Sequence, residues 1–242
     1  MAWASERYVT AAAQGSLHEL DREDFELSVV AAEEMVTNYE SRLVKMPGRP
    51  IYDAIRNAAA DDRCPMCGVG TVSTLDHNLP KRLFPALAVN PLNLVPVCSD
   101  CNKKKLDLAP SSAINQLLHP YFDRVEDELW LYASVIEGTP AAFRFVVEPP
   151  GNWPAVLGER VKHQFKILGL ARLYASQAAQ ELASIRHRLR RIHEIQGEAG
   201  VRAWLEDGYE SKVAHELNGW RTAMYSAMVA DAWFYSGGFD LR

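Results

Sequence analysis

Apolar residues in the N-terminal quarter of the chain recur at helical spacing. Ser16-Leu17-His18-Glu19 has the spacing of a capping box, in which residues three apart exchange hydrogen bonds at the start of a helix. The apolar positions that follow are separated by three, four or seven residues: Phe25, Val29, Val36, Tyr39 and Leu43. This pattern predicts an amphipathic helix that ends at the turn-forming residues 46–50, and then a short helix over 51–60. We therefore expect residues 1–60 to form an N-terminal helical arm.

In residues 61–110 the apolar positions no longer have helical spacing, and short runs of β-branched residues occur instead. Residues 69–75 are small or β-branched and predict a short strand after a Cys-x-x-Cys-Gly turn, and residues 93–97 predict a second strand. The prolines within 78–92 exclude a single regular element there and predict a long loop. Residues 99–106 begin with good helix-capping residues and predict a helix. The expected order is strand, loop, strand, helix.

Residues 111–242 begin with two apolar or alternating runs, 129–136 and 142–147, which flank a turn and predict a β-hairpin. From residue 160 onward, apolar residues recur every three or four positions, which predicts a long helix with one buried stripe and a bend at Gly169. A further helix over 212–234 should pack on it, before Gly237-Gly238 ends the regular chain. No repeat or low-complexity linker is present, so we expect one compact α+β body, mainly α-helical.

Composition is that of an ordinary globular protein. The chain has 242 residues, of which 48% are hydrophobic, enough for one good core or two small ones. No apolar run approaches the roughly 20 residues that span a bilayer. The first 15 residues lack the basic and apolar regions of a signal peptide. These features predict a soluble, cytoplasmic protein with no membrane partner.

The charge balance bears on nucleic-acid binding. The formal net charge is −5 and the pI is near 5.8, which is unexpected for a free-standing protein that neutralises phosphates. Two local clusters are basic, residues 103–105 and residues 186–191. Each could contact a phosphate backbone, and each could equally be a solvated helix face.

All four cysteines lie in two Cys-x-x-Cys pairs: Cys64, Cys67, Cys98 and Cys101. Four thiolates in two such pairs can close a tetrahedron around Zn²⁺, and in a reducing compartment this explains them better than disulfides do. The 30 residues between the pairs exceed the roughly 15–20 of a simple zinc ribbon. The sequence therefore predicts a structural zinc whose ligand pairs enclose a further element.

That intervening segment contains Asp76-His77, and Asn102 follows the last cysteine. Adjacent side chains on a strand leave on opposite faces, so one can bind a metal while the other faces a water. Zinc closure should bring Asp76, His77 and Asn102 together. The alternative for His77 is an ordinary packed or surface imidazole. Lys81 and Lys105 are candidate phosphate contacts, with solvated lysines as the alternative.

Three short motifs, LDHNLPK, PLNLVPVC and CNKKK, resemble the HNH or His-Me finger nuclease family, in the subset whose ββα-metal core contains a four-cysteine zinc. The resemblance covers about 42 residues. It implies that His77 is the general base, that Asp76 and Asn102 hold one divalent cation, Mg²⁺ or Mn²⁺, and that Asn93 braces the long loop and the histidine. The third position of the pattern is Asn102 where many members have histidine, a variation that the family uses with Asp-His.

The resemblance implies an endonuclease that hydrolyses DNA and leaves 5′-phosphate and 3′-hydroxyl ends. Helical regions around such a core resemble nucleases of bacterial defence and mobile-element systems. Because the net charge is acidic, we expect a partner that delivers the DNA, either an ATPase-like subunit or a second copy of the chain. The alternatives are a zinc-binding adaptor without catalysis, and a nuclease for RNA or for particular DNA structures.

Other candidate residues have simpler explanations. His119 lies in Leu118-His119-Pro120 and is expected to be a turn or packing residue. His187 and His193, within the arginine-rich stretch, are expected to be surface residues or contacts to backbone phosphate. The tryptophans more readily fill a core or an interface than stack on bases.

Overall fold

The computed structural model of the chain is α+β and mainly α-helical, as the sequence predicts. It describes residues 2–25, 32–45 and 47–241, so the predicted helix position Val29 lies outside the described residues. Within the described part of the chain, no helix combines the length and the apolar character needed to cross a membrane.

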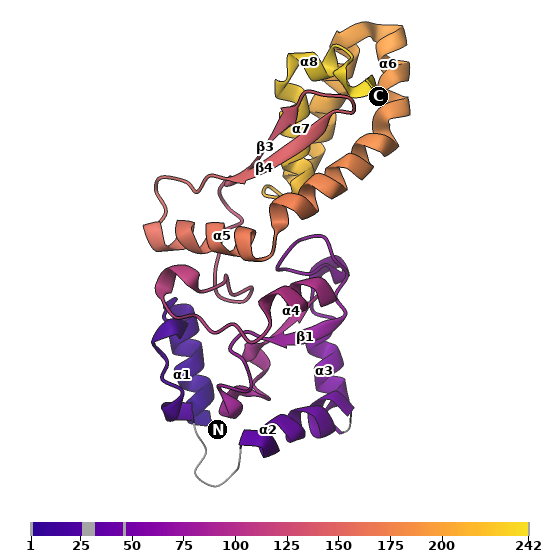
Figure 1. Cartoon of the computed structure of the whole chain (residues 1–242). Helices are drawn as coiled ribbons and strands as arrows, with labels where there is room; N and C mark the ends of the chain where they lie inside the picture. The colour runs from indigo at the N-terminus through magenta and orange to yellow at the C-terminus, as the bar shows by residue number, and fades with distance from the viewer. Residues whose placement is uncertain (1, 26–31, 46, 242) are drawn as a thin grey trace. The chain divides into compact units, whose positions relative to one another are not determined.

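The chain divides into two compact units (Figure 1). Unit 1 comprises Met1–Arg124 and Glu159–Leu168, and unit 2 comprises Val125–Gly158 and Gly169–Arg242. Unit 1 thus joins the predicted helical arm and the predicted cysteine-containing core with two pieces of the predicted C-terminal region. Each unit has its own core and is described by itself.

The N-terminal arm of unit 1 is helical but is not organised as predicted. Its elements are α1 (Ala2–Ala13), the 3-10 turns η1 (Leu17–Glu19) and η2 (Glu23–Phe25), α2 (Ala32–Asn38), the π-helix η3 (Tyr39–Lys45) and α3 (Arg49–Arg56). The apolar spacing correctly placed the helical residues from Ala32 onward, and both Tyr39 and Leu43 are buried. The short helix predicted over 51–60 exists as α3 and ends four residues earlier.

The predicted capping box at residues 16–19 was wrong as a helix start. Gly15 has φ +68, and the N–H of Ser16 donates to the carbonyl of Ala11 at 2.8 Å, so this sequence closes the C-terminal end of α1. Leu17 is buried in the 3-10 turn that follows. Serine and glycine are common at both ends of helices, so the local pattern did not show whether residues 15–19 begin a helix or end one.

The centre of unit 1 has the predicted order of strand, loop, strand and helix. Strand β1 (Thr74–His77) pairs antiparallel with β2 (Leu94–Val97), with His77 opposite Leu94, and α4 (Ser99–Lys105) follows. The first strand begins later than predicted. The residues before it form instead a turn closed by an isolated bridge between Arg63 and Thr71. Helix α3 contacts both strands, as Figure 1 shows beside β1.

The long loop between the strands is packed on two sides. One apolar cluster joins it to the N-terminal arm through buried side chains that include Tyr8, Phe25, Leu79, Phe84 and Leu87. A second cluster joins it to η3, α3 and the strands through Tyr39, Leu43, Tyr52, Leu75, Ala88 and Leu94. Burying each large side chain contributes about 1.5–3 kcal/mol, so the loop is held as firmly as a regular element.

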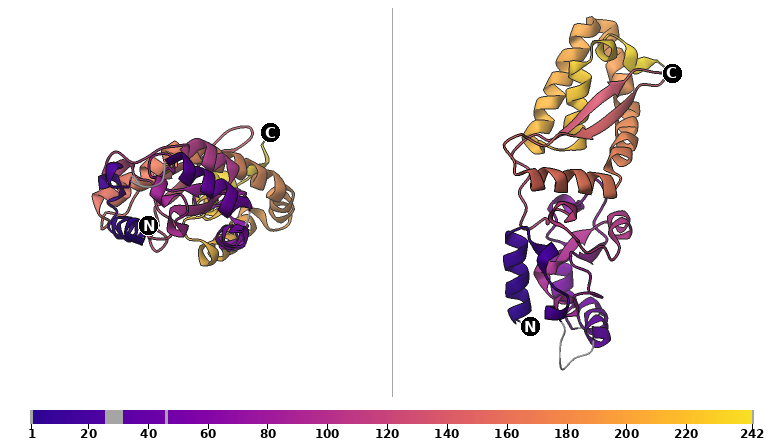
Figure 2. Two further views of the ribbon diagram at one scale, coloured as in Figure 1. Left: turned by 90° about the horizontal axis from the view of Figure 1, so that it is seen from below. Right: turned by 60° about the vertical axis from the view of Figure 1, so that its left-hand side comes forward.

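Unit 2 is a β-hairpin packed on helices. Strands β3 (Leu131–Ile136) and β4 (Ala142–Val147) form the predicted hairpin, in which Leu131 opposes Val147. The face with Phe143 and Phe145 is buried, and the hairpin contacts α6 (Leu170–His215) and α7 (Trp220–Ala230) (Figure 2). Alternation of apolar and polar positions predicted this arrangement, because a strand side chain points to the opposite face at each step.

The long C-terminal helices are interrupted more often than predicted. Gly169 has φ +60 and separates α5 (Ala155–Ile167) from α6, so it ends one helix rather than bending it. The single helix predicted over 212–234 was wrong. Its first four residues belong to α6, α7 begins at Trp220 after Gly219, and Asp231 ends α7 and caps α8 (Ala232–Tyr235) through a 2.8 Å bond from Phe234 N–H. Gly238 begins a last 3-10 turn, η8 (Gly238–Asp240).

Candidate metal centre and adjoining cavity

The four cysteines of unit 1 form a buried cluster that could hold a zinc ion. Their Sγ atoms all lie within 4.8 Å of one another, and those of Cys67 and Cys98 are 3.9 Å apart. Four thiolates at about 2.3 Å from one ion in a tetrahedron would be about 3.8 Å apart, which matches this spacing. No disulfide bond joins any of the four cysteines, and the 3.9 Å separation is almost twice the length of a disulfide bond, about 2.05 Å.

The local backbone is shaped around the sulfurs. Gly68 has φ +64, which lets the chain turn directly after the first cysteine pair. A Cβ at Gly70 would lie 2.7 Å from the Sγ of Cys98, so only glycine fits there. Backbone N–H groups face the sulfurs, from Gly70 to Cys67 Sγ at 3.4 Å and from Cys101 to Cys98 Sγ at 3.5 Å. Cys98 also caps α4, so the sulfur cluster sets where that helix begins.

The crowded thiols differ in their acidity. Hydrogen bonds from Cys101 and Cys64 lower the pKa of Cys67, whereas hydrogen bonds with Cys64 and Cys67 raise the pKa of Cys101. Adjacent thiolates repel one another unless a cation neutralises them. Zinc binds thiolates and releases their protons, so this donor set has the chemistry that the metal needs.

Beside the cluster, a cavity of about 400 Å³ brings the predicted reactive residues together. Asp76 and His77 reach it from the end of β1, and Asn102 reaches it from the first turn of α4, one residue after a cysteine of the cluster. Its lining also includes side chains that the motif did not predict: Tyr39, Lys103 and Asp107. Residues 26 positions apart in sequence thus share one cavity because the cysteine cluster holds α4 against the strands.

His77 is oriented by a backbone carbonyl. Its side chain is buried, 7% exposed, and its Nε2 lies 2.8 Å from the carbonyl oxygen of Ala88. A carbonyl can only accept, so Nε2 carries the ring proton and Nδ1 holds a lone pair. Nδ1 has no hydrogen-bond partner among the described residues. Burial lowers the pKa of His77 to about 4, so the ring is neutral near pH 7.

Asp76 is held by a buried lysine. The Nζ of Lys105 lies 3.0 Å from Asp76 Oδ2 and donates to the carbonyl of His77 at 2.6 Å. Lys105 is only 4% exposed, so the alternative of a solvated lysine is wrong, while the predicted phosphate contact stays a prediction. Burial raises the pKa of Asp76, and the ammonium of Lys105 opposes that increase. The pair fixes the end of β1 to the end of α4.

Asn93 holds the long loop in place. Its Oδ1 accepts from the N–H of Leu79 at 2.7 Å, and its Nδ2 donates to the carbonyls of Leu79 and Leu87 at 3.0 and 3.2 Å. Asn93 is fully buried, so these bonds satisfy an amide that water cannot reach. Leu87 precedes Ala88, whose carbonyl orients His77. Asn93 is therefore connected to the histidine through the loop backbone.

The three lysines that follow the last cysteine lie in three different environments. Lys103 is exposed at the cavity, Lys104 donates to the carbonyl of Leu168 after α5, and Lys105 is the buried partner of Asp76. Lys81 also lines the cavity, with its Nζ 4.5 Å from the centre of the Tyr39 ring and 3.4 Å from Glu40 Oε1. Lys81 and Lys103 are therefore the lysines whose positions suit an anion in the cavity.

Tyr39 and Asp107 are the site residues that the sequence did not reveal. The Tyr39 ring packs edge-on against His77, with centroids 4.6 Å apart, and Asp107 joins the cavity lining after α4. Tyr39 was predicted to lie on the apolar stripe of a helix. It is buried, as that stripe predicts, but the stripe gives no indication that the ring packs against His77. Asp107 follows a lysine run, and its only distinguishing mark in the sequence is a short distance from Asn102.

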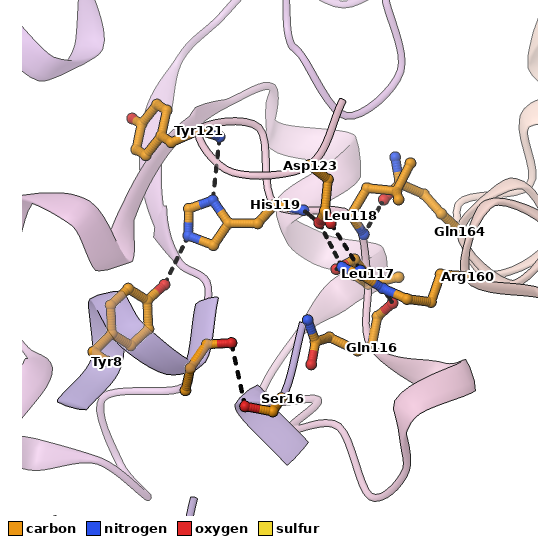
Figure 3. A network of polar contacts seen from close by, with 11 residues as sticks. Tyr8, Ser16, Gln116, Leu117, Leu118, His119, Tyr121, Asp123, Arg160 and Gln164 are labelled. Carbon is orange, nitrogen blue, oxygen red and sulfur yellow. Dashed lines mark hydrogen bonds and ion pairs between the residues drawn. The ribbon is translucent and has the colours of Figure 1, made fainter. Parts of the chain in front are cut away.

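A second buried histidine, His119, lies in a polar network of unit 1 (Figure 3). Its Nδ1 accepts from the N–H of Tyr121 at 3.2 Å, so Nε2 carries the proton and contacts the hydroxyl of Tyr8 at 2.8 Å and the carbonyl of Leu92 at 3.2 Å. Next to it, Arg160 forms a buried ion pair with Asp123. His119 is a packing residue, and it ties α1 to the segment that precedes β2.

A comparison with known proteins finds a relative of the chain in a bacteriophage. The chain is 37% identical over 153 residues, 61% of its length, to Protein ea31 of Escherichia phage lambda, and that name describes no activity. The matched part covers 51% of the phage protein, so the chain spans about half the length of this relative. No protein-family model matches the chain. No solved structure matches it significantly.

Proposed function

We propose that the chain is a metal-dependent HNH endonuclease that hydrolyses DNA phosphodiester bonds, with a structural zinc in the cysteine cluster. The observation that supports this most is the shared cavity. It presents a neutral imidazole with an unpartnered Nδ1 beside a carboxylate oxygen and an amide. An adaptor with only a structural zinc has no need for these three side chains.

Each residue has a distinct part in the proposed reaction. His77 removes a proton from the attacking water through Nδ1, because the bond to Ala88 keeps the ring proton on Nε2. Asp76 and Asn102 would hold one divalent cation, Mg²⁺ or Mn²⁺, which suits their oxygen ligands. When bound, such a cation supplies charge neutralisation at the phosphoryl group and at the departing 3′-oxygen. The products are a 5′-phosphate and a 3′-hydroxyl.

Lys105 is a positioning residue in this scheme. Its ammonium holds one oxygen of Asp76 and the backbone of His77, so the two neighbours keep their relative orientation. Asn93 acts in the same way on the other side, through Leu87 and Ala88. The acidic net charge supports a partner that delivers DNA, an ATPase-like subunit or a second copy, as in a bacterial defence system.

The decisive experiment is a cleavage assay with supercoiled, linear and single-stranded DNA and with RNA, in Mg²⁺ or Mn²⁺, with wild type and His77→Ala side by side. We expect cleavage of DNA that stops when the divalent cation is omitted and falls about 10²–10⁴-fold in the variant. Equal cleavage by the variant would exclude His77 as the base. No cleavage by the wild type, alone or with the products of neighbouring genes, would favour the zinc adaptor. Cleavage of RNA but not DNA would show that the substrate is RNA.

Metal analysis separates the two proposed metals. Purified wild type and His77→Ala should contain one zinc per chain, and Cys98→Ser should lose zinc together with the cooperative unfolding transition, because the sulfur cluster sets the start of α4. If His77→Ala lost zinc as fully as Cys98→Ser, the structural and reactive sites would not be separable.

A further inference from the structure

The arginine-rich segment of α6, residues 186–191, is outside the proposed active site, and its side chains fall into two groups. Arg186 and Arg190 are engaged by the C-terminal turn η8. Arg186 Nε donates to the carbonyl of Phe239 at 3.0 Å, and Arg190 Nε donates to Asp240 Oδ2 at 2.9 Å. These two arginines fasten the end of the chain to α6.

The second group consists of His187, Arg188 and Arg191, which are exposed and have no ionic or hydrogen-bond partner among the described residues. Positions three and four apart share one face of a helix, so the three side chains form a single basic surface. The arginines are about 4.5 Å apart along the helix axis. We call these three residues the α6 basic face.

The charge around this face is positive although the whole chain is acidic. Between Glu181 and Glu194 the sequence contains four arginines, two histidines and no carboxylate. Glu181 is itself paired with Arg221 at 3.2 Å. Asp240, in the C-terminal turn η8, is paired with Arg190. Glu194 lies within one helical turn of Arg190 and Arg191 and offsets part of their charge, whereas Arg188 has no acidic neighbour on this segment of α6.

We propose that the α6 basic face binds the phosphate backbone of double-stranded DNA. Guanidinium groups match phosphate oxygens in charge and in geometry. A protein partner fits less well, because Ile195 is the single large exposed apolar side chain that α6 presents in the described chain, too little for an interface core. The inference rests on the proposed function, since it names the surface with which the nuclease holds its substrate.

The number of contacts predicts the strength of the effect. Each phosphate neutralised adds about 0.9 to the slope of log affinity against log salt concentration. Two arginines therefore account for a slope of about 2, and for a roughly 10- to 60-fold gain in affinity near 0.1 M salt. This is a modest contribution, as suits a protein of net charge −5 that needs a partner for tight binding.

The test measures binding of a labelled DNA duplex to the full chain, from 20 to 200 mM salt, with zinc retained and without Mg²⁺ or Mn²⁺ so that cleavage does not enter. Arg188→Gln/Arg191→Gln should bind 10- to 60-fold more weakly near 0.1 M salt, with a slope lower by about 2. Arg188→Lys/Arg191→Lys keeps the charge and should retain most of the slope.

The matched control is Arg202→Gln/Lys212→Gln. It lowers the net charge by the same amount, at positions that follow the break in α6 at Gly197, where φ is +66. Both side chains are already engaged, Arg202 with Glu206 at 3.0 Å and Lys212 over the Tyr225 ring at 5.3 Å. Its salt slope should equal that of the wild type. Thermal unfolding of each variant verifies that it is folded, which is expected at exposed positions.

Four results would overturn the proposal: no binding by the wild type at 20 mM salt, an unchanged slope in Arg188→Gln/Arg191→Gln, an equal loss in the control, or preferred binding of RNA. The proposed function fails separately. Salt-dependent DNA binding without cleavage in Mg²⁺ or Mn²⁺ would overturn the proposed nuclease activity but not DNA binding by the α6 basic face. Cleavage with an unchanged salt slope in Arg188→Gln/Arg191→Gln would overturn DNA binding by the α6 basic face but not the nuclease activity.

Discussion

His77 and His119 are alike by every simple measure of their environment. Both belong to unit 1, both are buried, and burial lowers the pKa of each to about 4. Both carry the ring proton on Nε2, which in His77 faces the carbonyl of Ala88 and in His119 faces the hydroxyl of Tyr8 and the carbonyl of Leu92. Their difference is at Nδ1. In His119 this atom accepts from the N–H of Tyr121 (Figure 3), and in His77 it has no partner among the described residues.

The difference shows that a shifted pKa does not identify a catalytic base. Burial alone produces the same shift in a histidine that packs and in one that lines a cavity. What distinguishes a base is a lone pair that can reach a water. Both nitrogens of His119 are engaged, Nδ1 by the N–H of Tyr121 and Nε2 by Tyr8 and Leu92, so the ring has no lone pair available for chemistry. His77 keeps one nitrogen unused at a cavity with Asp76 and Asn102.

The largest expected effect is on cleavage. Glutamine can still donate to the carbonyl of Ala88 but cannot take a proton from water, so His77→Gln should lower the rate about 10²–10⁴-fold, or about 3–5 kcal/mol of barrier. His119→Gln should stay within a few-fold of wild type when both are assayed well below their melting temperatures. Single-turnover cleavage with saturating metal measures the difference, and comparable losses in the two variants would remove the distinction drawn at Nδ1.

Local patterns predicted this site better than they predicted its surroundings. The cysteine pairs, Asp76-His77 and Asn102 could be recognised because ligand spacing and strand alternation act over a few residues. Tyr39 could not be placed beside His77, because that contact depends on how the N-terminal arm packs on β1, almost forty residues further along the chain. The burial of Lys105, which the sequence offered as a phosphate contact or a solvated lysine, could not be predicted for the same reason, since it depends on how α4 packs against β1.

The next expected effect is on stability, and here the loss should be larger for a substitution of His119 than for one of His77. His119→Phe removes the ring's bonds to the N–H of Tyr121, to the carbonyl of Leu92 and to the buried hydroxyl of Tyr8, which should cost about 3 kcal/mol. His77→Phe removes one bond, to Ala88, and should cost about 1 kcal/mol. Urea unfolding at pH 7.5 measures both. A larger loss in His77→Phe than in His119→Phe would mean that His77 is the more structural residue.

The pH dependence of stability should contain a term from His119. Its pKa is about 4 in the folded chain and about 6.5 when unfolded, so the unfolded state binds more protons between these values. The stability that the neutral His119 ring contributes is fully present above pH 6.5 and is lost as the pH falls towards 4. The loss in free energy of unfolding is roughly 2–3 kcal/mol by pH 4.5. His119→Gln should therefore lose less stability than wild type between pH 7 and 4.5, and equal losses would contradict the assigned titration. Protonation of the cysteine cluster affects both proteins alike and cancels in the difference.

The smallest effect compares the two tyrosines that contact the histidines. The hydroxyl of Tyr8 accepts from His119 Nε2 at 2.8 Å, whereas the hydroxyl of Tyr39 has no hydrogen-bond partner among the described residues and its ring edge supports His77. Tyr8→Phe should therefore cost about 1 kcal/mol of unfolding free energy, and Tyr39→Phe less than about 0.5 kcal/mol. Neither substitution removes a ring, so both should preserve cleavage, and paired urea titrations resolve the difference. If Tyr39→Phe slowed cleavage without a change in stability, the hydroxyl would have a part at Nδ1 of His77, and the cavity would contain a polar contact that distinguishes the two histidines further.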